Sequence, residues 1–119
     1  MNDINDIAEK HDIIKSIGIE SALEQLAEES AELTHAALKL SRVLRGVNPT
    51  PISTSDAVLA LHEEVNDVLL CVSVLESALG SLRSDSIMSN KLMRWEKRLN
   101  EIHGGGAVMQ SVGGTNDDT

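Results

Sequence analysis

Two long segments of the chain carry apolar side chains every third or fourth residue, which is the spacing of an α-helix with one apolar face. The segments cover about residues 19–45 and 56–79. The first apolar stripe consists of Ala22, Leu26, Glu29, Leu33, Ala36, Leu40 and Val43. The second consists of Ala57, Leu61, Glu64, Val68, Cys71, Leu75 and Ala78. Each stripe is therefore interrupted by a single acidic residue, Glu29 in the first helix and Glu64 in the second.

Two shorter helices are expected, one on each side of this pair. The first covers about residues 2–17 and ends at Gly18, because glycine readily takes the backbone conformation that stops a helix. The last begins near Ser84 or Asp85 and ends near His103. Its apolar stripe consists of Met88, Leu92, Trp95, Leu99 and Ile102.

The remaining segments have the composition of loops. Residues 46–55 contain both prolines, and Ser53 or Ser55 is expected to cap the helix that follows. Residues 104–119 are rich in glycine and lack periodicity, so we predict a flexible tail. The expected organisation is one helical domain, residues 1–103, followed by that tail.

The apolar composition favours helices packed on helices. The chain has no Phe, no Tyr and one Trp, so its apolar volume comes from Leu, Ile, Val and Ala. A chain of 119 residues buries a limited core by itself, and helical chains of this size often complete their core by dimerising. We therefore predict an all-α, four-helix bundle-type subunit completed by homodimerisation, as a dimer or a dimer of dimers.

Charge and cysteine content exclude several classes of protein. The net charge of −9 argues against nonspecific binding to nucleic acid or to anionic membranes, because both need basic patches. No apolar stretch is long enough to span a membrane, and the acidic N-terminus does not resemble a signal peptide. The only cysteine, Cys71, cannot form an internal disulfide and lies in an apolar run. We expect a buried thiol and a reducing, cytoplasmic setting.

Each interrupting acid has a second acid three residues later. Glu32 follows Glu29, and Asp67 follows Glu64, so each pair shares one helix face. If the two long helices pack antiparallel, the four carboxylates converge and repel each other unless a cation lies between them. Oxygen ligands select hard ions, which makes Mg²⁺ the expected ion and Mn²⁺ the alternative.

One such pair alone would usually mark a solvated helix face. An unpaired carboxylate inside an apolar stripe, however, costs several kcal/mol, on the order of other buried ions. Two pairs on two long helices, each within a stripe, are therefore less expected by chance and favour a metal site.

The acidic motifs resemble those of the MazG-like, all-α nucleoside triphosphate pyrophosphohydrolases, and the resemblance covers about residues 18–101. The Glu-Glu-x-x-Glu motif of that family is similar to residues 28–32, within LEQLAEESAELTHAALKL, and its Glu-x-x-Asp motif to residues 64–67, within LHEEVNDVLL. The closing segment KLMRWEKRL resembles the basic last helix of short, phage-type members. Residues 33–63 form a longer gap than most members show, which the proline-containing loop can absorb.

The resemblance implies a dimerising helical bundle that depends on Mg²⁺ and cleaves nucleoside triphosphates between the α and β phosphates. The products would be the monophosphate and pyrophosphate. The metal-binding and catalytic acids of the family fall on Glu29, Glu32, Glu64 and Asp67. Glu28 matches the first acid of the motif and receives no role.

Phosphate groups also need cations from the protein. Lys91, Arg94 and Arg98 form one basic stripe on the last helix, and Lys39 lies two turns beyond Glu32. We predict these four as phosphate contacts. The alternative is a set of solvated cations, since positive charge is favourable near the C-terminus of any helix.

Two other functions stay open. Glu32-x-x-His35 is half of the signature of a di-iron bundle protein, although the second half is missing. A non-catalytic helical interaction module would use the acids as ion-pair partners within an oligomer. Trp95 falls in an apolar stripe and is expected in the core or a dimer interface. The other histidines, His11, His62 and His103, are interpreted as structural or surface residues. No glycine-rich phosphate loop follows a strand, which excludes P-loop chemistry.

Overall fold

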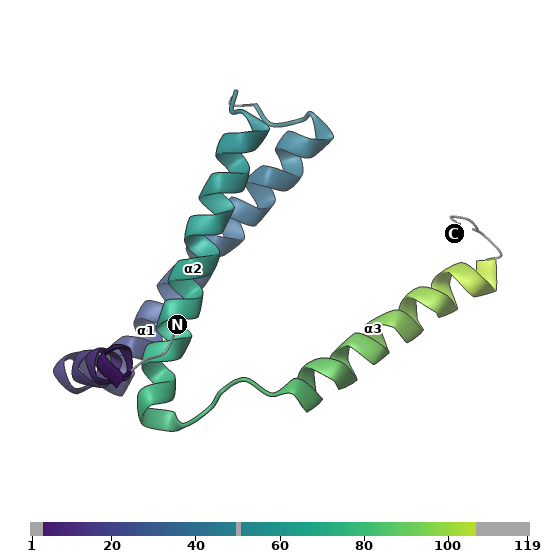
Figure 1. Ribbon diagram of the computed structural model, residues 1–119. Coiled ribbons are helices and arrows are strands. Elements are labelled where there is room, and N and C mark those ends of the chain that lie inside the picture. The colour runs from purple at the N-terminus through teal and green to yellow at the C-terminus, as the bar shows by residue number, and fades with distance from the viewer. Residues whose placement is uncertain (1–3, 50, 107–119) are drawn as a thin grey trace. The chain divides into compact units, whose positions relative to one another are not determined.

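The computed structural model describes residues 4–49 and 51–106, and these residues form three helices and no strand (Figure 1). Helix α1 covers Ile4–Arg45, α2 covers Thr54–Leu79 and α3 covers Asp85–Gly106. The predicted all-helical class is confirmed, whereas the four-helix bundle and the dimer remain predictions. The chain divides into two compact units, Met1–Leu82 and Arg83–Thr119, which are described separately below.

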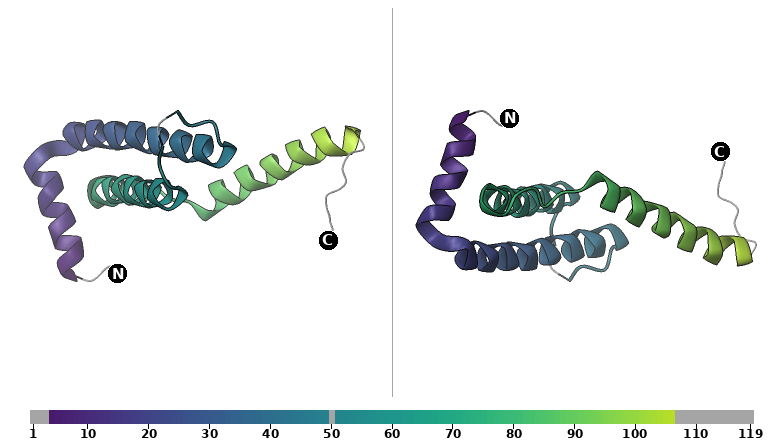
Figure 2. Two further views of the ribbon diagram at one scale, coloured as in Figure 1. Left: turned by 90° about the horizontal axis from the view of Figure 1, so that it is seen from above. Right: turned by 90° about the horizontal axis from the view of Figure 1, so that it is seen from below.

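Helix α1 contains a sharp kink at Gly18. This residue has φ 86° and ψ 160°, a combination that essentially only glycine adopts. Figure 2 shows the part of α1 before the kink bending away from the rest of the helix. The predicted interruption at Gly18 is therefore confirmed, although the chain resumes its helix at once. Residues 4–17 are called the N-terminal arm from here on.

The first turns of α2 and α3 are both stabilised by a serine. The backbone N–H of Asp56 donates to Ser53 Oγ at 3.0 Å, which satisfies a donor at the start of α2. Ser84 Oγ accepts a similar bond from the backbone N–H of Ile87 at 3.2 Å. The first residues of α2 and α3 were both predicted to within two residues. Ser53 was one of the two residues expected to cap α2.

The end of α3 differs from the prediction. The helix continues to Gly106, three residues beyond the expected end at His103. Glycine is a poor helix former, costing roughly 1 kcal/mol per residue relative to alanine, but it does not forbid a last helical turn. The rest of the predicted tail, residues 107–119, lies outside the described residues.

The first unit is a pair of helices packed side by side, with the loop of residues 46–53 between them (Figure 1). Its core residues are Ile14, Ala22, Ala57, Val74 and Leu75, of which Leu75 is completely buried. Leu26 packs against the cluster that Ile14, Ala22, Val74 and Leu75 form. Most other members of the two predicted stripes are half-buried. The stripes therefore predicted the contact face of both helices.

The N-terminal arm packs against the C-terminal half of α2. Ile14, on the arm, belongs to the same buried cluster as Val74 and Leu75 on α2. The Ser77 hydroxyl donates to the carbonyl of Val74 at 2.6 Å and lies 3.5 Å from the carbonyl of Lys10 on the arm. The kink thus lets α1 contribute two differently directed segments to one small core.

The second unit is built on α3, and a single helix cannot bury its own apolar side chains. All described side chains of residues 85–104 are exposed, and Trp95 has an exposed fraction of 63%. Trp95 was expected in the core or in a dimer interface, and within the single chain its side chain is not buried in a core. Among the described residues, no helix is both long and apolar enough to cross a membrane.

Substitution of Gly18 by alanine tests the kink. A Cβ at this φ and ψ is strained whatever the surrounding space, so Gly18→Ala should lower the free energy of unfolding by about 1–3 kcal/mol. Chemical denaturation followed by circular dichroism measures the change. Gly104→Ala is the matched control: it lies in a helix with open space around it and should not be destabilising. Equal stability of Gly18→Ala and wild type would contradict the assigned backbone conformation.

Candidate metal centre between α1 and α2

Three of the four predicted acids converge between α1 and α2. One carboxylate oxygen each from Glu29, Glu64 and Asp67 lie within 4.8 Å of one another. Glu29 comes from α1, whereas Glu64 and Asp67 lie one turn apart on α2. Glu29 and Glu64 are half-buried because they occupy positions in the packed stripes, and Asp67 is exposed at the edge. These three residues are called the acidic trio.

Two oxygens of the trio are out of contact with solvent and have no hydrogen-bond partner among the described residues. They are Glu29 Oε1 and Glu64 Oε1. Leaving a desolvated carboxylate oxygen unpaired is costly, and the cost rises when like charges surround it. A divalent cation between the carboxylates would satisfy both oxygens and offset the repulsion. The donor set therefore fits a hard metal ion.

A glutamine fixes the orientation of one of these carboxylates. Gln25 Nε2 donates to Glu29 Oε2 at 2.8 Å, one turn earlier on α1. The bond occupies one oxygen of Glu29 and leaves Oε1 for the trio. Gln25 was not among the residues predicted from the sequence, although a polar pair four residues apart on a helix is a recognisable signal.

The electrostatic effect of the other acids is clearest at Glu64. Desolvation raises the pKa of the Glu64 carboxyl, and the charges of Glu32, Asp67 and Glu29 raise it further. Glu32 is thus close enough to act on the trio, although its oxygens are not among the three that converge. The predicted quartet consists of a convergent trio and an exposed neighbour.

Cys71 lies one turn beyond Asp67 on α2. Burial raises the pKa of its thiol, and the charges of Glu29 and Asp67 act in the same direction. A raised pKa keeps the thiol protonated, which agrees with the interpretation that it is not a nucleophile. The thiol was predicted to be buried, and Cys71 is half-buried.

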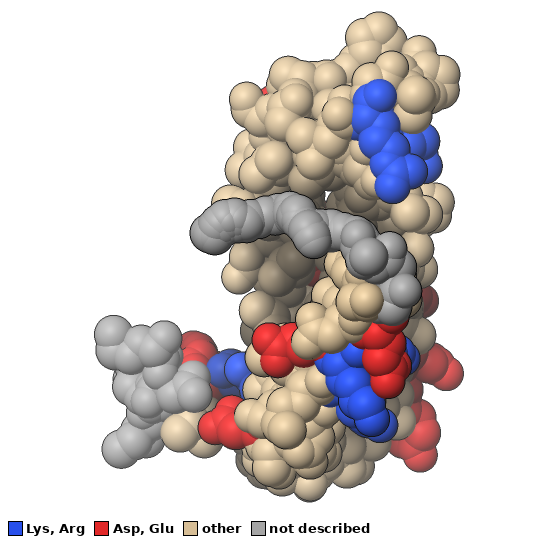
Figure 3. All heavy atoms as spheres, turned by 90° about the vertical axis from the view of Figure 1, so that its right-hand side faces the viewer, with Lys and Arg blue, Asp and Glu red and all other residues tan. Residues whose placement is uncertain are grey.

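A groove of about 320 Å³ extends from the trio toward the loop end of the helix pair. It is lined by Glu32, His35, Ala36, Lys39, Arg42, Ala60 and Glu64. Lys39 was predicted from its position, and Arg42, three residues later on the same face, was missed. In Figure 3, lysine and arginine side chains gather near this end of the pair, with few acidic side chains beside them. The end of the groove that carries Lys39 and Arg42 is called the cationic groove.

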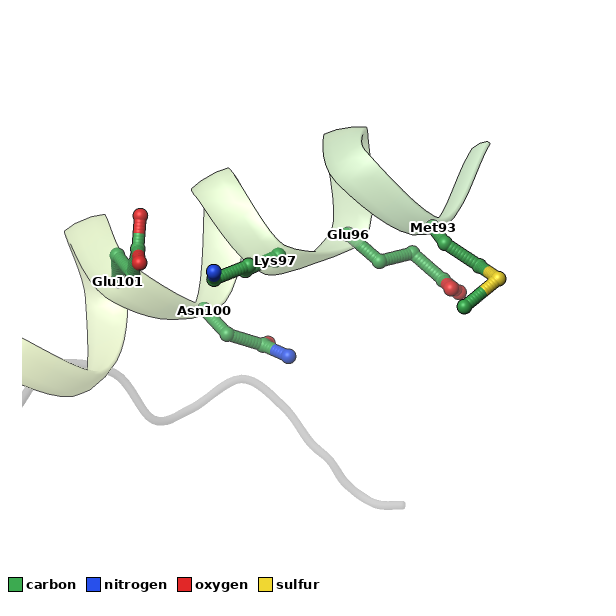
Figure 4. A pocket seen from close by; sticks show the side chains of 5 residues that line it. All are labelled: Met93, Glu96, Lys97, Asn100 and Glu101. Atoms are coloured by element: carbon green, nitrogen blue, oxygen red, sulfur yellow. The ribbon is translucent and has the colours of Figure 1, made fainter. Parts of the chain in front are cut away.

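The other predicted phosphate contacts, Lys91, Arg94 and Arg98, lie on α3 in the second unit and are exposed. Their assignment to phosphate therefore stays a prediction. Figure 4 shows a depression whose described lining residues all come from α3, namely Met93, Glu96, Lys97, Asn100 and Glu101. Side chains from one helix cannot enclose a ligand, so we assign no site there.

Comparison with protein-family models, with curated proteins and with solved structures finds no match to this chain.

Magnesium binding should stabilise the folded chain measurably. At Mg²⁺ concentrations about a hundredfold above Kd, a ligand specific for the native state adds about 2.7 kcal/mol, which corresponds to a rise in Tm of roughly 10 °C or more for a domain of this size. Thermal unfolding with and without Mg²⁺ measures this rise.

Glu64→Gln should lose the Mg²⁺-dependent rise in Tm and keep or increase the metal-free Tm, because a repelling charge is removed. Glu24→Gln, at an exposed position of α1, is the control and should respond to Mg²⁺ like the wild type. A full Mg²⁺ response in Glu64→Gln would show that the ion binds elsewhere.

Proposed function

We propose that the chain is a Mg²⁺-dependent nucleoside triphosphate pyrophosphohydrolase of the MazG-like, all-α type. It would hydrolyse an NTP or dNTP to the monophosphate and pyrophosphate. The observation that carries the proposal is the pair of unpartnered, desolvated oxygens of Glu29 and Glu64 beside Asp67. The two acidic motifs, in the order and on the helices that the resemblance requires, support it.

The acids proposed to hold the ion are Glu29, Glu32, Glu64 and Asp67. All of them offer oxygen, so Mg²⁺ is the proposed cofactor and Mn²⁺ the alternative. Bound there, the ion would offset charge on the triphosphate oxygens and lower the pKa of the attacking water. Gln25 keeps Glu29 oriented toward the trio through its bond to Oε2.

The reaction requires one proton acceptor and a site for the leaving group. The water oxygen forms a bond to the α-phosphorus, and the bond from that phosphorus to the bridging oxygen breaks. Pyrophosphate leaves with the bridging oxygen. A carboxylate that the ion does not fully use would accept the proton that the water releases. Lys39 and Arg42 in the cationic groove would bind the pyrophosphate charge.

We also propose that the enzyme is a homodimer or a dimer of dimers. Among the described residues, the first unit has five buried apolar side chains, a small core for a stable domain. The exposed apolar stripe of α3 needs a surface to cover it, because an isolated amphipathic helix is marginally stable in water. A cytoplasmic setting is proposed from the single free cysteine. The same exposed stripe would suit the second candidate, a non-catalytic helical interaction module.

Turnover should depend on the trio. Asp67→Asn and Glu29→Gln should each lower the rate of pyrophosphate release by more than about 100-fold, since even the loss of residues that only orient metal ligands costs 10–100-fold. Release is measured with Mg²⁺ on a panel of canonical and modified nucleotides, and circular dichroism verifies that the helices persist. Glu24→Gln should keep wild-type turnover. Undiminished release by both trio variants would exclude the proposed site.

The assembly should depend on α3. Light scattering coupled to size-exclusion chromatography should give at least twice the mass of one chain for the wild type and the mass of one chain for Trp95→Asp, because a charge in an apolar interface is poorly tolerated. Asn90→Asp adds the same charge to α3 outside the apolar stripe and should stay oligomeric. A monomeric wild type would refute the proposed dimer.

A further inference from the structure

His35, on α1, lines the groove of about 320 Å³ that extends from the acidic trio. Within the described part of the chain, the charged residues that line this groove are Glu32, Lys39 and Arg42 from α1 and Glu64 from α2. The His35 side chain is exposed, so its ring is accessible to a ligand that enters the groove.

The first alternative for His35 is metal binding, because Glu32-x-x-His35 is half of a di-iron signature. The ligand atoms that converge in the described residues, however, belong to Glu29, Glu64 and Asp67, and His35 is not a member of that group. The structure therefore places the imidazole in the groove beside the acidic trio, where it can contact a substrate held by the ion.

Along α1, His35 lies between the acids and the cations of the groove. It follows Glu32 by three residues and precedes Lys39 by four, which are rises of about 4.5 and 6 Å along a helix. In the proposed reaction the ion holds the triphosphate at the acids, and Lys39 and Arg42 bind the departing pyrophosphate. The bond that breaks joins these two parts of the substrate, so its bridging oxygen belongs in the stretch that carries His35.

Short side chains leave space beside the imidazole ring. Ala36, the next residue on α1, and Ala60, on α2, both line the groove. Neither side chain extends beyond its Cβ atom, so a phosphate group can approach the ring of His35 between the two helices.

The proposed hydrolysis builds up negative charge on the bridging oxygen. When the bond from the α-phosphorus breaks, this oxygen keeps the electron pair, and a positioned acid that protonates it lowers the barrier. Arginine stays protonated in proteins, and lysine ordinarily releases its proton only in alkaline solution, so neither residue type is suited to this task. Histidine can both hold and release a proton near neutral pH.

We propose that His35 is the general acid that protonates the leaving pyrophosphate. The protonated ring donates a hydrogen bond to the bridging oxygen and transfers that proton as the bond to the α-phosphorus breaks. Pyrophosphate leaves with the proton, and solvent water protonates the neutral ring again before the next turnover. The attacking water gives its own proton to a carboxylate. The inference rests on the proposed function and adds a catalytic residue that lies outside the two acidic motifs.

Substrates with different leaving groups test the acid directly. Two analogues of the preferred nucleotide carry a methylene or a difluoromethylene group between the β and γ phosphorus atoms, so the bond to be cleaved keeps its oxygen. Fluorine withdraws electron density, which makes the difluoromethylene leaving group the less basic of the two. Release of the nucleoside monophosphate with Mg²⁺ gives kcat for each analogue.

His35→Gln keeps a hydrogen-bond donor and removes the proton that can be transferred. Its kcat for the methylene analogue should fall at least about 100-fold, the lower range for a general acid, and the fall for the difluoromethylene analogue should be about tenfold smaller. A structural role of His35 would lower both rates by the same factor. Equal losses with the two analogues, or no loss with either, would overturn the acid.

His62→Gln is the matched control for this comparison. His62 is also exposed, lies on α2 and does not line the groove. The variant should cleave both analogues at wild-type rates. A loss in His62→Gln that depends on the leaving group as in His35→Gln would overturn the assignment to His35.

The contact between His35 and the leaving group can be measured without turnover. In the isotope-labelled full-length protein with Mg²⁺, inorganic pyrophosphate should shift the nitrogen NMR signals of the His35 ring, which are identified by their loss in His35→Gln. The ring signals of His62 should keep their positions. Unchanged His35 signals at saturating pyrophosphate would overturn the proposed contact.

Monophosphate release by the wild type separates this inference from the proposed function. Release from the preferred nucleotide, combined with equal losses for the two analogues in His35→Gln, overturns the acid and leaves the hydrolase standing. Absence of release by the wild type on every nucleotide overturns the hydrolase and the acid together.

Discussion

The packing of two apolar stripes, one on each long helix, is the constraint on which the first unit depends. Ala22 and Leu26 of α1 meet Val74 and Leu75 of α2, and this contact fixes how the helices are aligned along their length. Because Glu29 and Glu64 occupy positions within the same stripes, the contact that forms the core also brings the acids together. Folding and site assembly are therefore one event, and a shift of one helical turn between α1 and α2 would separate the trio.

The residues that could be predicted from the sequence are those whose position follows from helical periodicity. The stripes, the break at Gly18, the serine cap and the convergence of Glu29, Glu64 and Asp67 all follow from spacings along a single helix or from one antiparallel pairing. Gln25 and Arg42 were missed because their roles depend on side-chain direction at the contact, which spacing leaves open. The extra turn of α3 does not follow from composition, because glycine lowers the stability of a helix without excluding a last helical turn.

Glu29 and Glu64 are acidic residues at positions where helix packing favours apolar side chains. Every other position in the two stripes carries an apolar side chain, and both acids lower the stability of a contact with few fully buried residues. Such departures from consistent patterning are expected at functional sites, where stability is given up for chemistry. The pKa of Glu64 is raised for the same reason, because the folded chain removes its carboxyl from water and places it beside other carboxylates.

The kink at Gly18 separates two tasks that a straight helix would have to combine. Residues after it carry Glu29 and the groove cations, whereas residues before it, such as Ile13, form one wall of a cavity of about 170 Å³ that Cys71 also lines. Substitutions in the arm can therefore reshape that wall while the carboxylates keep their alignment. Variants that differ only in this arm would therefore change the surface beside the helix pair and leave Glu29, Glu64 and Asp67 in place.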